Sequence, residues 1–297
     1  MNPDKYLKSP LRYPGGKSRL VKTMIELLPN FYEYREPMLG GGSMFLAILT
    51  KYPNKKYWVN DLNYDLYCFW KSLKERGNDL ANEAKKLKEE FKLNGKGLFY
   101  YLKDSNSNNE FEIGIRFYIL DMISFSGLVD AGGYSELSFQ ERFTNNAISR
   151  LRSISPFLGQ VRISNLAYQE ILSESGENLF YYLDPPYYSQ RASKLYGKRG
   201  LYHTIFDHQV FADTVKMIQH KWLLSYDDSE FVRNLYSTYR NKIKFVSASY
   251  GMNNVWKNTA PKGKELLIMN YDLSQDKRTI ANQKIEDYLE AGSIDTI

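Results

Sequence analysis

A carboxylate, two prolines and a tyrosine stand directly after a short apolar run. Residues 179–183 read Leu-Phe-Tyr-Tyr-Leu, and Asp184, Pro185, Pro186 and Tyr187 follow. Proline has no backbone N–H and cannot continue a central strand, so these residues predict a strand end with carbonyl groups directed past it. The Asp184 carboxylate and the Pro185 carbonyl could each accept one N–H of an amino group on a planar base, while Tyr187 stacks on that base. A strand-terminating turn is the alternative, because Asp-Pro is a common turn opener.

The composition indicates a folded protein with an anionic partner. The chain has 297 residues, 43% of them hydrophobic, and a net charge of 40 − 34 = +6 with a pI near 9.0. A basic balance of this kind favours nucleic acid without naming it. Cys68 is the only cysteine and there are three histidines, so we expect no disulfide and no metal site. No long uncharged apolar stretch and no signal-like start are found, which predicts a cytoplasmic protein without a membrane partner.

The first glycine-containing motif lies near the amino terminus. Tyr13, Gly16 and Lys17 precede a helical pattern that begins at Leu20. The Gly-Lys-Ser sequence is not a P-loop, because Leu11 occupies the position of that motif's first glycine. A glycine turn at a helix amino terminus still suits an anion or a carboxylate, with Lys17 as the counter-charge. A plain loop that enters a helix is the alternative.

The second motif is typical of the opening of a nucleotide-binding βαβ unit. Residues 36–43 read Glu-Pro-Met-Leu-Gly-Gly-Gly-Ser and are followed by the apolar run 44–49. Phe45 stands where a dinucleotide fingerprint has a third small residue, so the loop favours a nucleoside cofactor without a pyrophosphate. The next strand pattern, 56–59, leads to Asp61, and an acidic residue in this place binds ribose hydroxyls in such folds.

Seven strand patterns set the expected fold. They centre near positions 35, 58, 163, 181, 223, 246 and 267, with helical patterns between them. This rhythm predicts a Rossmann-like, mostly parallel, seven-stranded α/β sheet with helices on both faces, and ligands at the carboxyl ends of the strands. Residues 65–150 show helical patterns only. We therefore expect a catalytic domain of residues 1–64 and 151–297 that is interrupted by a helical domain of residues 65–150.

A basic segment follows the proline motif. Arg191, Lys194, Lys198 and Arg199 are interleaved with aromatic and glycine residues. A cationic loop beside a catalytic pocket favours phosphate contacts and hence DNA binding. A solvated surface loop is the alternative.

Taken in order, these motifs resemble those of the Dam-type N6-adenine-specific DNA methyltransferases. The matching stretches are Tyr-Pro-Gly-Gly-Lys17, the glycine loop 36–42, Asn-Asp-Leu-Asn63, Asp-Pro-Pro-Tyr187 and the strand patterns near 223 and 267. The resemblance implies S-adenosylmethionine as cofactor, double-stranded DNA and a possible cognate restriction endonuclease as partners, and residues 65–150 as the target-recognition domain. It makes Asp184, Pro185, Pro186 and Tyr187 the catalytic tetrapeptide. It places the cofactor against Tyr13, Gly16, Lys17, Glu36, Met38, Gly40, Gly42, Ser43, Asp61, Leu62, Tyr168 and Asp184.

The chain departs from the family pattern at two places. Ala167 stands where members often carry an acidic residue, which removes a hydrogen bond to the adenine amino group of the cofactor. Residues 124–127 read Ser-Phe-Ser-Gly in place of the commoner Asn-Phe-Asn-Gly, so base contacts are not carried over.

The resulting interpretation is an S-adenosylmethionine-dependent enzyme that methylates the N6 amino group of a flipped-out adenine at a short DNA site. A methyltransferase acting on RNA or on protein glutamine and a catalytically silent DNA-binding module are the alternatives. A cytosine-C5 enzyme is excluded, because it needs a cysteine nucleophile and Cys68 does not lie in a loop after a strand.

Overall fold

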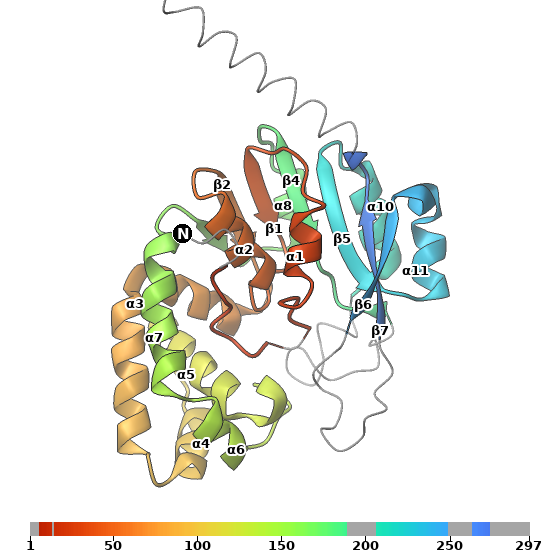
Figure 1. Cartoon of the computed structure of the whole chain (residues 1–297). Coiled ribbons are helices and arrows are strands. Elements are labelled where there is room, and N and C mark those ends of the chain that lie inside the picture. Colours follow the sequence, from red (N-terminus) through yellow and green to blue (C-terminus); the bar gives the residue numbers. More distant parts are fainter. Residues whose placement is uncertain (1–5, 14, 189–205, 249–262, 274–297) are drawn as a thin grey trace, which may run out of the picture.

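The structure is a computed structural model that describes residues 6–13, 15–188, 206–248 and 263–273 (Figure 1). Within these ranges seven strands form one sheet in the order β3-β2-β1-β4-β5-β7-β6. Strands β1 to β5 are parallel to one another, and β7 lies antiparallel between β5 and β6. The predicted mostly parallel sheet is therefore confirmed. The strands are β1 (Glu33–Glu36), β2 (Lys56–Asn60), β3 (Arg162–Ser164), β4 (Leu179–Leu183), β5 (Lys221–Asp227), β6 (Ile243–Ala248) and β7 (Gly263–Met269).

Alternating apolar side chains give the sheet two covered faces. In β4, Phe180 and Tyr182 belong to one buried cluster, whereas Leu179, Tyr181 and Leu183 belong to another. Successive strand residues point to opposite faces, so a strand that is apolar throughout must be covered on both sides. Helices α1 (Val21–Ile25) and α2 (Ser43–Lys51) pack in the first cluster, and α8 (Tyr168–Ser173), α10 (His208–Met217) and α11 (Glu230–Leu235) pack in the second.

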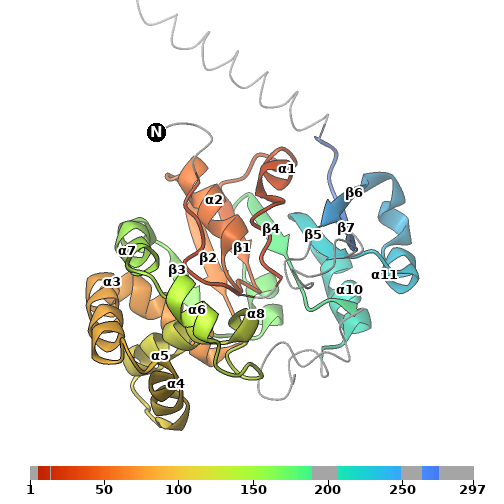
Figure 2. The ribbon, with the colours of Figure 1, turned by 60° about the horizontal axis from the view of Figure 1, so that its bottom comes forward.

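A group of helices is inserted between β2 and β3. In Figures 1 and 2 they lie together beside the β2–β3 edge of the sheet. The first of them, α3, bends at Arg76, where the backbone is not helical. The inserted helices share a continuous apolar core with the sheet domain through Trp70, whose ring packs against Phe45. They are α3 (Tyr64–Glu90), α4 (Gly95–Asp104), α5 (Glu110–Ile123), α6 (Glu136–Glu141) and α7 (Asn145–Ile154).

The strand order brings three chain-distant loops to one place. The chain runs from β1 to β2 and β3 on one side and then returns to β4 on the other side of β1. The loops that follow β1, β2 and β4 therefore leave the same edge of the sheet as neighbours. A crevice opens at such a reversal of strand order, outside the carboxyl ends of the strands.

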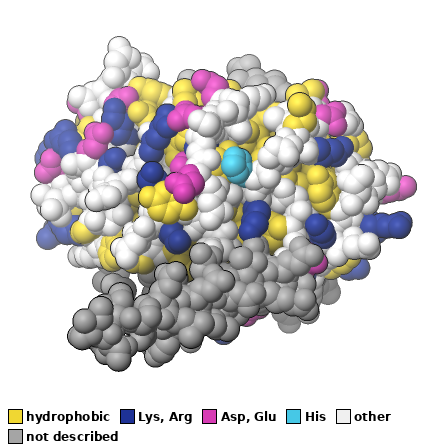
Figure 3. All heavy atoms as spheres, turned by 90° about the horizontal axis from the view of Figure 1, so that it is seen from above, with side chains coloured by type: hydrophobic (Ala, Val, Ile, Leu, Met, Phe, Trp, Pro, Cys, Tyr) yellow, Lys and Arg dark blue, Asp and Glu magenta, His cyan; other side chains and the backbone are white. Residues whose placement is uncertain are grey.

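The surface seen from above carries Lys and Arg side chains interspersed with acidic and apolar ones (Figure 3). Among the described helices, none combines the length and the apolar character that a membrane span requires.

Candidate active site

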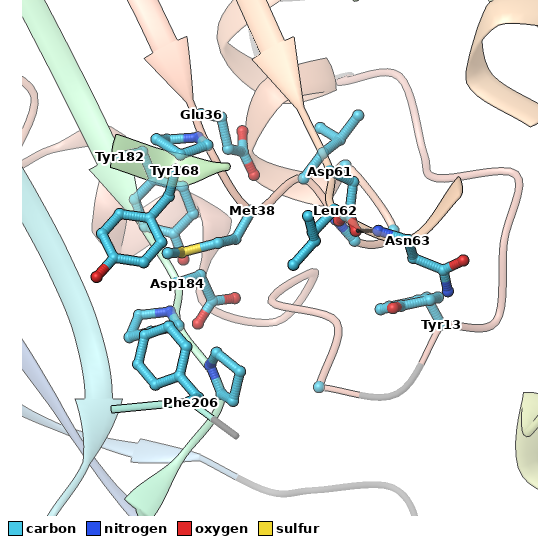
Figure 4. Close-up of a pocket in the computed structure, with 18 of the residues that line it drawn as sticks. Tyr13, Glu36, Met38, Asp61, Leu62, Asn63, Tyr168, Tyr182, Asp184 and Phe206 are labelled. Atoms are coloured by element: carbon cyan, nitrogen blue, oxygen red, sulfur yellow. Dashed lines mark hydrogen bonds between the residues drawn. The ribbon is translucent and has the colours of Figure 1, made fainter. Parts of the chain in front are cut away.

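A cavity of about 360 Å³ opens at the carboxyl ends of β1 to β4. Figure 4 shows Glu36, Met38 and Asp184 on one side of this space and Asp61 and Leu62 on the other. The structure places every residue of the expected cofactor set and of the tetrapeptide around this one cavity. These are Tyr13, Gly16, Lys17, Glu36, Met38, Gly40, Gly42, Ser43, Asp61, Leu62, Tyr168, Asp184, Pro185, Pro186 and Tyr187.

The glycine loop after β1 requires glycine at two positions. Gly40 and Gly42 adopt φ angles of 51° and 64°. These lie in the left-handed region, which residues other than glycine rarely adopt. A Cβ at Gly42 would lie 2.7 Å from the Trp70 ring, and one at Gly40 would lie 3.1 Å from Tyr13. The loop can therefore keep this shape only with glycine at these two positions.

Asp61 is fixed at the tip of β2 by backbone donors. Its Oδ2 accepts the N–H of Gly40 at 2.8 Å, and its Oδ1 accepts the N–H of Asn63 at 2.9 Å. Burial raises the pKa of Asp61 to about 6, against the lowering effect of these two hydrogen bonds. Each oxygen keeps a further lone pair, so the carboxylate can still accept hydroxyl donors from the cavity.

Asp184 lies between two donors from distant parts of the chain. Lys17 Nζ donates to its Oδ2 at 2.7 Å, and Ser225 Oγ donates to its Oδ1 at 2.8 Å. Burial alone would lower the pKa of Lys17, but Asp184 and then Glu265 outweigh it and raise that pKa above its ordinary value. The ammonium is thus charged, and the carboxylate is held in one orientation.

The Tyr187 ring is packed within the site and is not an exposed turn residue. Its hydroxyl donates to Glu265 Oε1 at 2.5 Å, and its ring stacks with Tyr226 at 6.0 Å between centroids. Lys17 Nζ lies 4.9 Å from the centre of the same ring. The next residue, Tyr188, is anchored by its N–H to Asp227 Oδ1 at 2.8 Å. These contacts favour a built site over a simple strand-terminating turn.

Glu36 is the second buried carboxyl group of the cavity wall. It accepts the Tyr34 hydroxyl at 2.5 Å and is 2% exposed. Burial raises the pKa of Glu36 well above its ordinary value, and the neighbouring Asp184 adds to that effect. The hydrogen bond from Tyr34 therefore holds the Glu36 side chain in place in the wall of the cavity.

Sequence reasoning missed two side chains that complete the site. Ser225 holds Asp184, and Glu265 holds Tyr187, but Ser225 is one polar residue among apolar neighbours in β5, and Glu265 follows Lys264 where β7 begins. Their position toward the cavity depends on strand order, which no local signal reveals. The predicted DNA-contacting residues Arg191, Lys194, Lys198 and Arg199 lie outside the described residues.

The Ala167 departure also lies at the cavity. Ala167 lines it at the amino terminus of α8, where the Ala167 N–H donates to Glu170 Oε1 at 3.0 Å. Over the part of the chain that the structure describes, no three His, Cys, Asp or Glu side chains converge as metal ligands would.

Comparisons with known proteins agree with this geometry. Residues 13–252 match the model of the D12 class N6 adenine-specific DNA methyltransferase family. The chain is 28% identical over 196 residues to the Type II methyltransferase M.MjaIII of Methanocaldococcus jannaschii, covering 60% of this chain and 68% of that protein. It is 26% identical over 247 residues to the DNA adenine methylase of Serratia marcescens, covering 76% and 86%.

One solved structure, the rRNA methyltransferase aviRa from Streptomyces viridochromogenes, matches over 86% of each chain, with 9% identity and a TM-score of 0.35. That likeness is too distant to bear on the reaction.

Proposed function

The chain belongs to the D12 class of N6 adenine-specific DNA methyltransferases, and from this premise we propose how its cavity serves the reaction. The enzyme methylates adenine in DNA. The family match spans residues 13–252, so the RNA and protein-glutamine alternatives lose their support. Within this family we assign the cavity to S-adenosylmethionine and the tetrapeptide Asp184–Tyr187 to a flipped-out adenine.

The cavity residues fit S-adenosylmethionine. Gly40 and Gly42 leave the wall of the loop open to a nucleoside, and Asp61 offers lone pairs to ribose hydroxyls. Met38 and Tyr168 supply an apolar surface on the side of Asp184. When bound, this cofactor supplies a methyl group activated by a sulfonium centre.

Asp184 and the Pro185 carbonyl are the acceptors for the target amino group. An adenine in a duplex cannot reach a pocket, so the base must leave the stack, and Tyr187 then provides a ring for it to stack on. The amino nitrogen is a weak nucleophile because its lone pair is delocalised into the ring. Two acceptors favour a more tetrahedral nitrogen, and the Asp184 charge stabilises the positive charge that develops there.

Lys17 and Ser225 prepare Asp184 for this role. Each occupies one lone-pair site of the carboxylate, at 2.7 Å and 2.8 Å, and leaves one site on each oxygen. A carboxylate held in this way needs no reorganisation when the substrate arrives, which is the condition for electrostatic stabilisation of the transition state.

The observation that carries the proposal is that Asp184 stands at one cavity shared by the glycine loop, Asp61 and Tyr187. The test is incubation of the purified protein with methyl-labelled S-adenosylmethionine and, in separate reactions, duplex DNA, RNA and a glutamine-containing protein. We expect label in DNA alone, recovered as N6-methyladenine after digestion to nucleosides. Label in RNA or protein, or DNA binding without label, would contradict the proposal.

We also propose that methylation occurs at one short site and that a restriction endonuclease reading the same site accompanies the enzyme. The relative M.MjaIII carries the name Type II methyltransferase, which supports such a pairing. A DNA substrate is consistent with the expected cytoplasmic location. Sequencing DNA from expressing cells with modified-base detection would show the site, and methylation scattered over all adenines would contradict it.

A further inference from the structure

Glu265 is a fully buried carboxylate on β7, one strand in from the edge of the sheet, and it lies beside the proposed target-adenine site. It lies on β7, where it is opposite Asp227 of β5 and Val246 of β6. Its side chain is 0% exposed. A buried carboxylate is costly unless it is paired and hydrogen-bonded, so its partners show what it does there.

Two contacts of this carboxylate belong to the site. Its Oε1 accepts the Tyr187 hydroxyl at 2.5 Å, and the same oxygen lies 3.8 Å from Lys17 Nζ. Lys17 in turn donates to Asp184. Glu265 therefore contacts the ring of the tetrapeptide and the cation that orients its carboxylate, and it does so from a strand that follows the tetrapeptide by 78 positions.

The Tyr187 ring is fixed at three points. Tyr226 stacks against it, Lys17 lies over it, and Glu265 holds its hydroxyl. Stacking and the cation contact leave the ring free to slide in its own plane, because both act on its faces. The hydrogen bond at the phenol oxygen removes that freedom, since a charge-assisted hydrogen bond of this length is directional.

We propose that Glu265 is a positioning residue of the methyl transfer: it anchors the Tyr187 hydroxyl and so fixes the position of the ring beside the target adenine. This inference rests on the proposed function. It adds a residue from β7 that acts through Tyr187 and does not touch the substrate.

The test is a double-mutant cycle with a conservative control. Tyr187→Phe removes the anchored hydroxyl, Glu265→Met removes the acceptor at nearly constant length, and Glu265→Gln keeps an acceptor oxygen. Tyr236→Phe removes another buried tyrosine hydroxyl of the same apolar cluster, one that has no hydrogen-bond partner among the described residues, and serves as the matched control. Each protein is assayed in a single turnover at saturating S-adenosylmethionine and DNA, and in equilibrium binding of the cofactor.

We expect Tyr187→Phe and Glu265→Met each to slow methylation about tenfold, as removal of a hydrogen bond to a charged group would. The double variant should be no slower than the slower single variant. The methylation rate of Glu265→Gln should stay within about threefold of the parent rate, and the rate of Tyr236→Phe should equal the parent rate.

Cofactor affinity should be unchanged in Tyr187→Phe. A general loss of structure would lower that affinity. DNA with 2-aminopurine at the target position should show weaker stacking of the flipped base in Tyr187→Phe and Glu265→Met.

The role of Glu265 would be overturned if Tyr187→Phe methylated at the parent rate. It would also be overturned if the rate loss of the double variant were the product of the losses in Tyr187→Phe and Glu265→Met. Either result would leave the proposed function intact. If Glu265→Met does not fold, the cycle of Glu265→Gln and Tyr187→Phe decides. In that case Glu265→Gln must not slow methylation further in a protein that already carries Tyr187→Phe. A parent enzyme that forms no N6-methyladenine would overturn the proposed function and this inference together.

Discussion

Lys17 Nζ lies 2.7 Å from Asp184 Oδ2, although the two residues are 167 positions apart in the chain. Lys17 is 6% exposed, and it also donates to the Gly15 carbonyl at 2.9 Å. The amino-terminal glycine turn therefore delivers a fixed cation to the carboxylate that follows β4. The direction of the Asp184 carboxylate is therefore set before any substrate enters.

Replacement of Asp184 should reduce turnover far more than DNA affinity. In Asp184→Ala the acceptor is lost, and a loss of about 100-fold or more in kcat is expected from ~3 kcal/mol for a charged acceptor in a dry site. Asp184→Asn keeps an oxygen without the charge and should show a partial defect. Single-turnover methylation at saturating cofactor and DNA is the measurement.

Two controls accompany this prediction. Asp184→Ala removes one ion-pair partner of Lys17, which lines the cofactor cavity and then keeps its contact with Glu265 at 3.8 Å. Because this change can alter the cavity, cofactor binding must be measured separately. Asp213→Ala removes a surface carboxylate of α10 and should leave the rate unchanged. Near-parental methylation by Asp184→Ala would mean that the tetrapeptide is only a turn.

Ala167→Asp should tighten S-adenosylmethionine binding. A carboxylate at this position of the cavity wall adds one acceptor for the adenine amino group of the cofactor, worth about 1 kcal/mol for one net hydrogen bond. The same side chain can cap α8, so Ala167→Ser, which caps but reaches less far, is the matched control. Calorimetric titration that shows unchanged or weaker binding in Ala167→Asp would mean that residue 167 is not aligned with the family's acidic position.

Cofactor affinity should fall as the pH drops below about 6. The pKa of Asp61 in the free enzyme is about 6, and binding to ribose hydroxyls favours the ionised form. Protonation removes acceptor capacity, so affinity is constant above this pKa and declines by up to about tenfold per pH unit below it. Asp61→Asn should bind more weakly at neutral pH and without this dependence. A parent enzyme whose affinity is flat between pH 5 and 7 would exclude ionised Asp61 as the ribose acceptor.

Replacement of Lys198 and Arg199 by alanine should weaken DNA binding and reduce its salt dependence. If both side chains touch phosphate, the slope of log K against log salt should fall by roughly 2. Lys51→Ala with Lys56→Ala makes the same charge change near the amino end of β2, opposite the cavity, and serves as the control. An unchanged slope in the Lys198 and Arg199 variant would assign those two charges to solvent.

The sequence by itself determined the strands, the turns and the family. Runs such as 179–183 are apolar throughout, and prolines 185 and 186 end that strand because they lack the N–H that a sheet requires. Glycines 40 and 42 predicted a tight loop before a helix, and their left-handed backbone confirms it. These are local requirements of the backbone, so they can be read from neighbouring residues. The motif order, which resembles the Dam type, is confirmed by the family match.

Only the tertiary structure decided which side chains meet at Asp184 and Tyr187. Lys17, Ser225 and Glu265 reach them across 167, 41 and 78 positions of the chain. Ser225 lies between apolar neighbours in β5, and Glu265 follows Lys264 at the start of β7, and both patterns equally suit a polar residue at a sheet edge. Their meeting follows from β5 lying beside β4 and from β7 entering antiparallel between β5 and β6. Strand order is set by the packing of the whole core, and a local pattern of residue types carries no record of it.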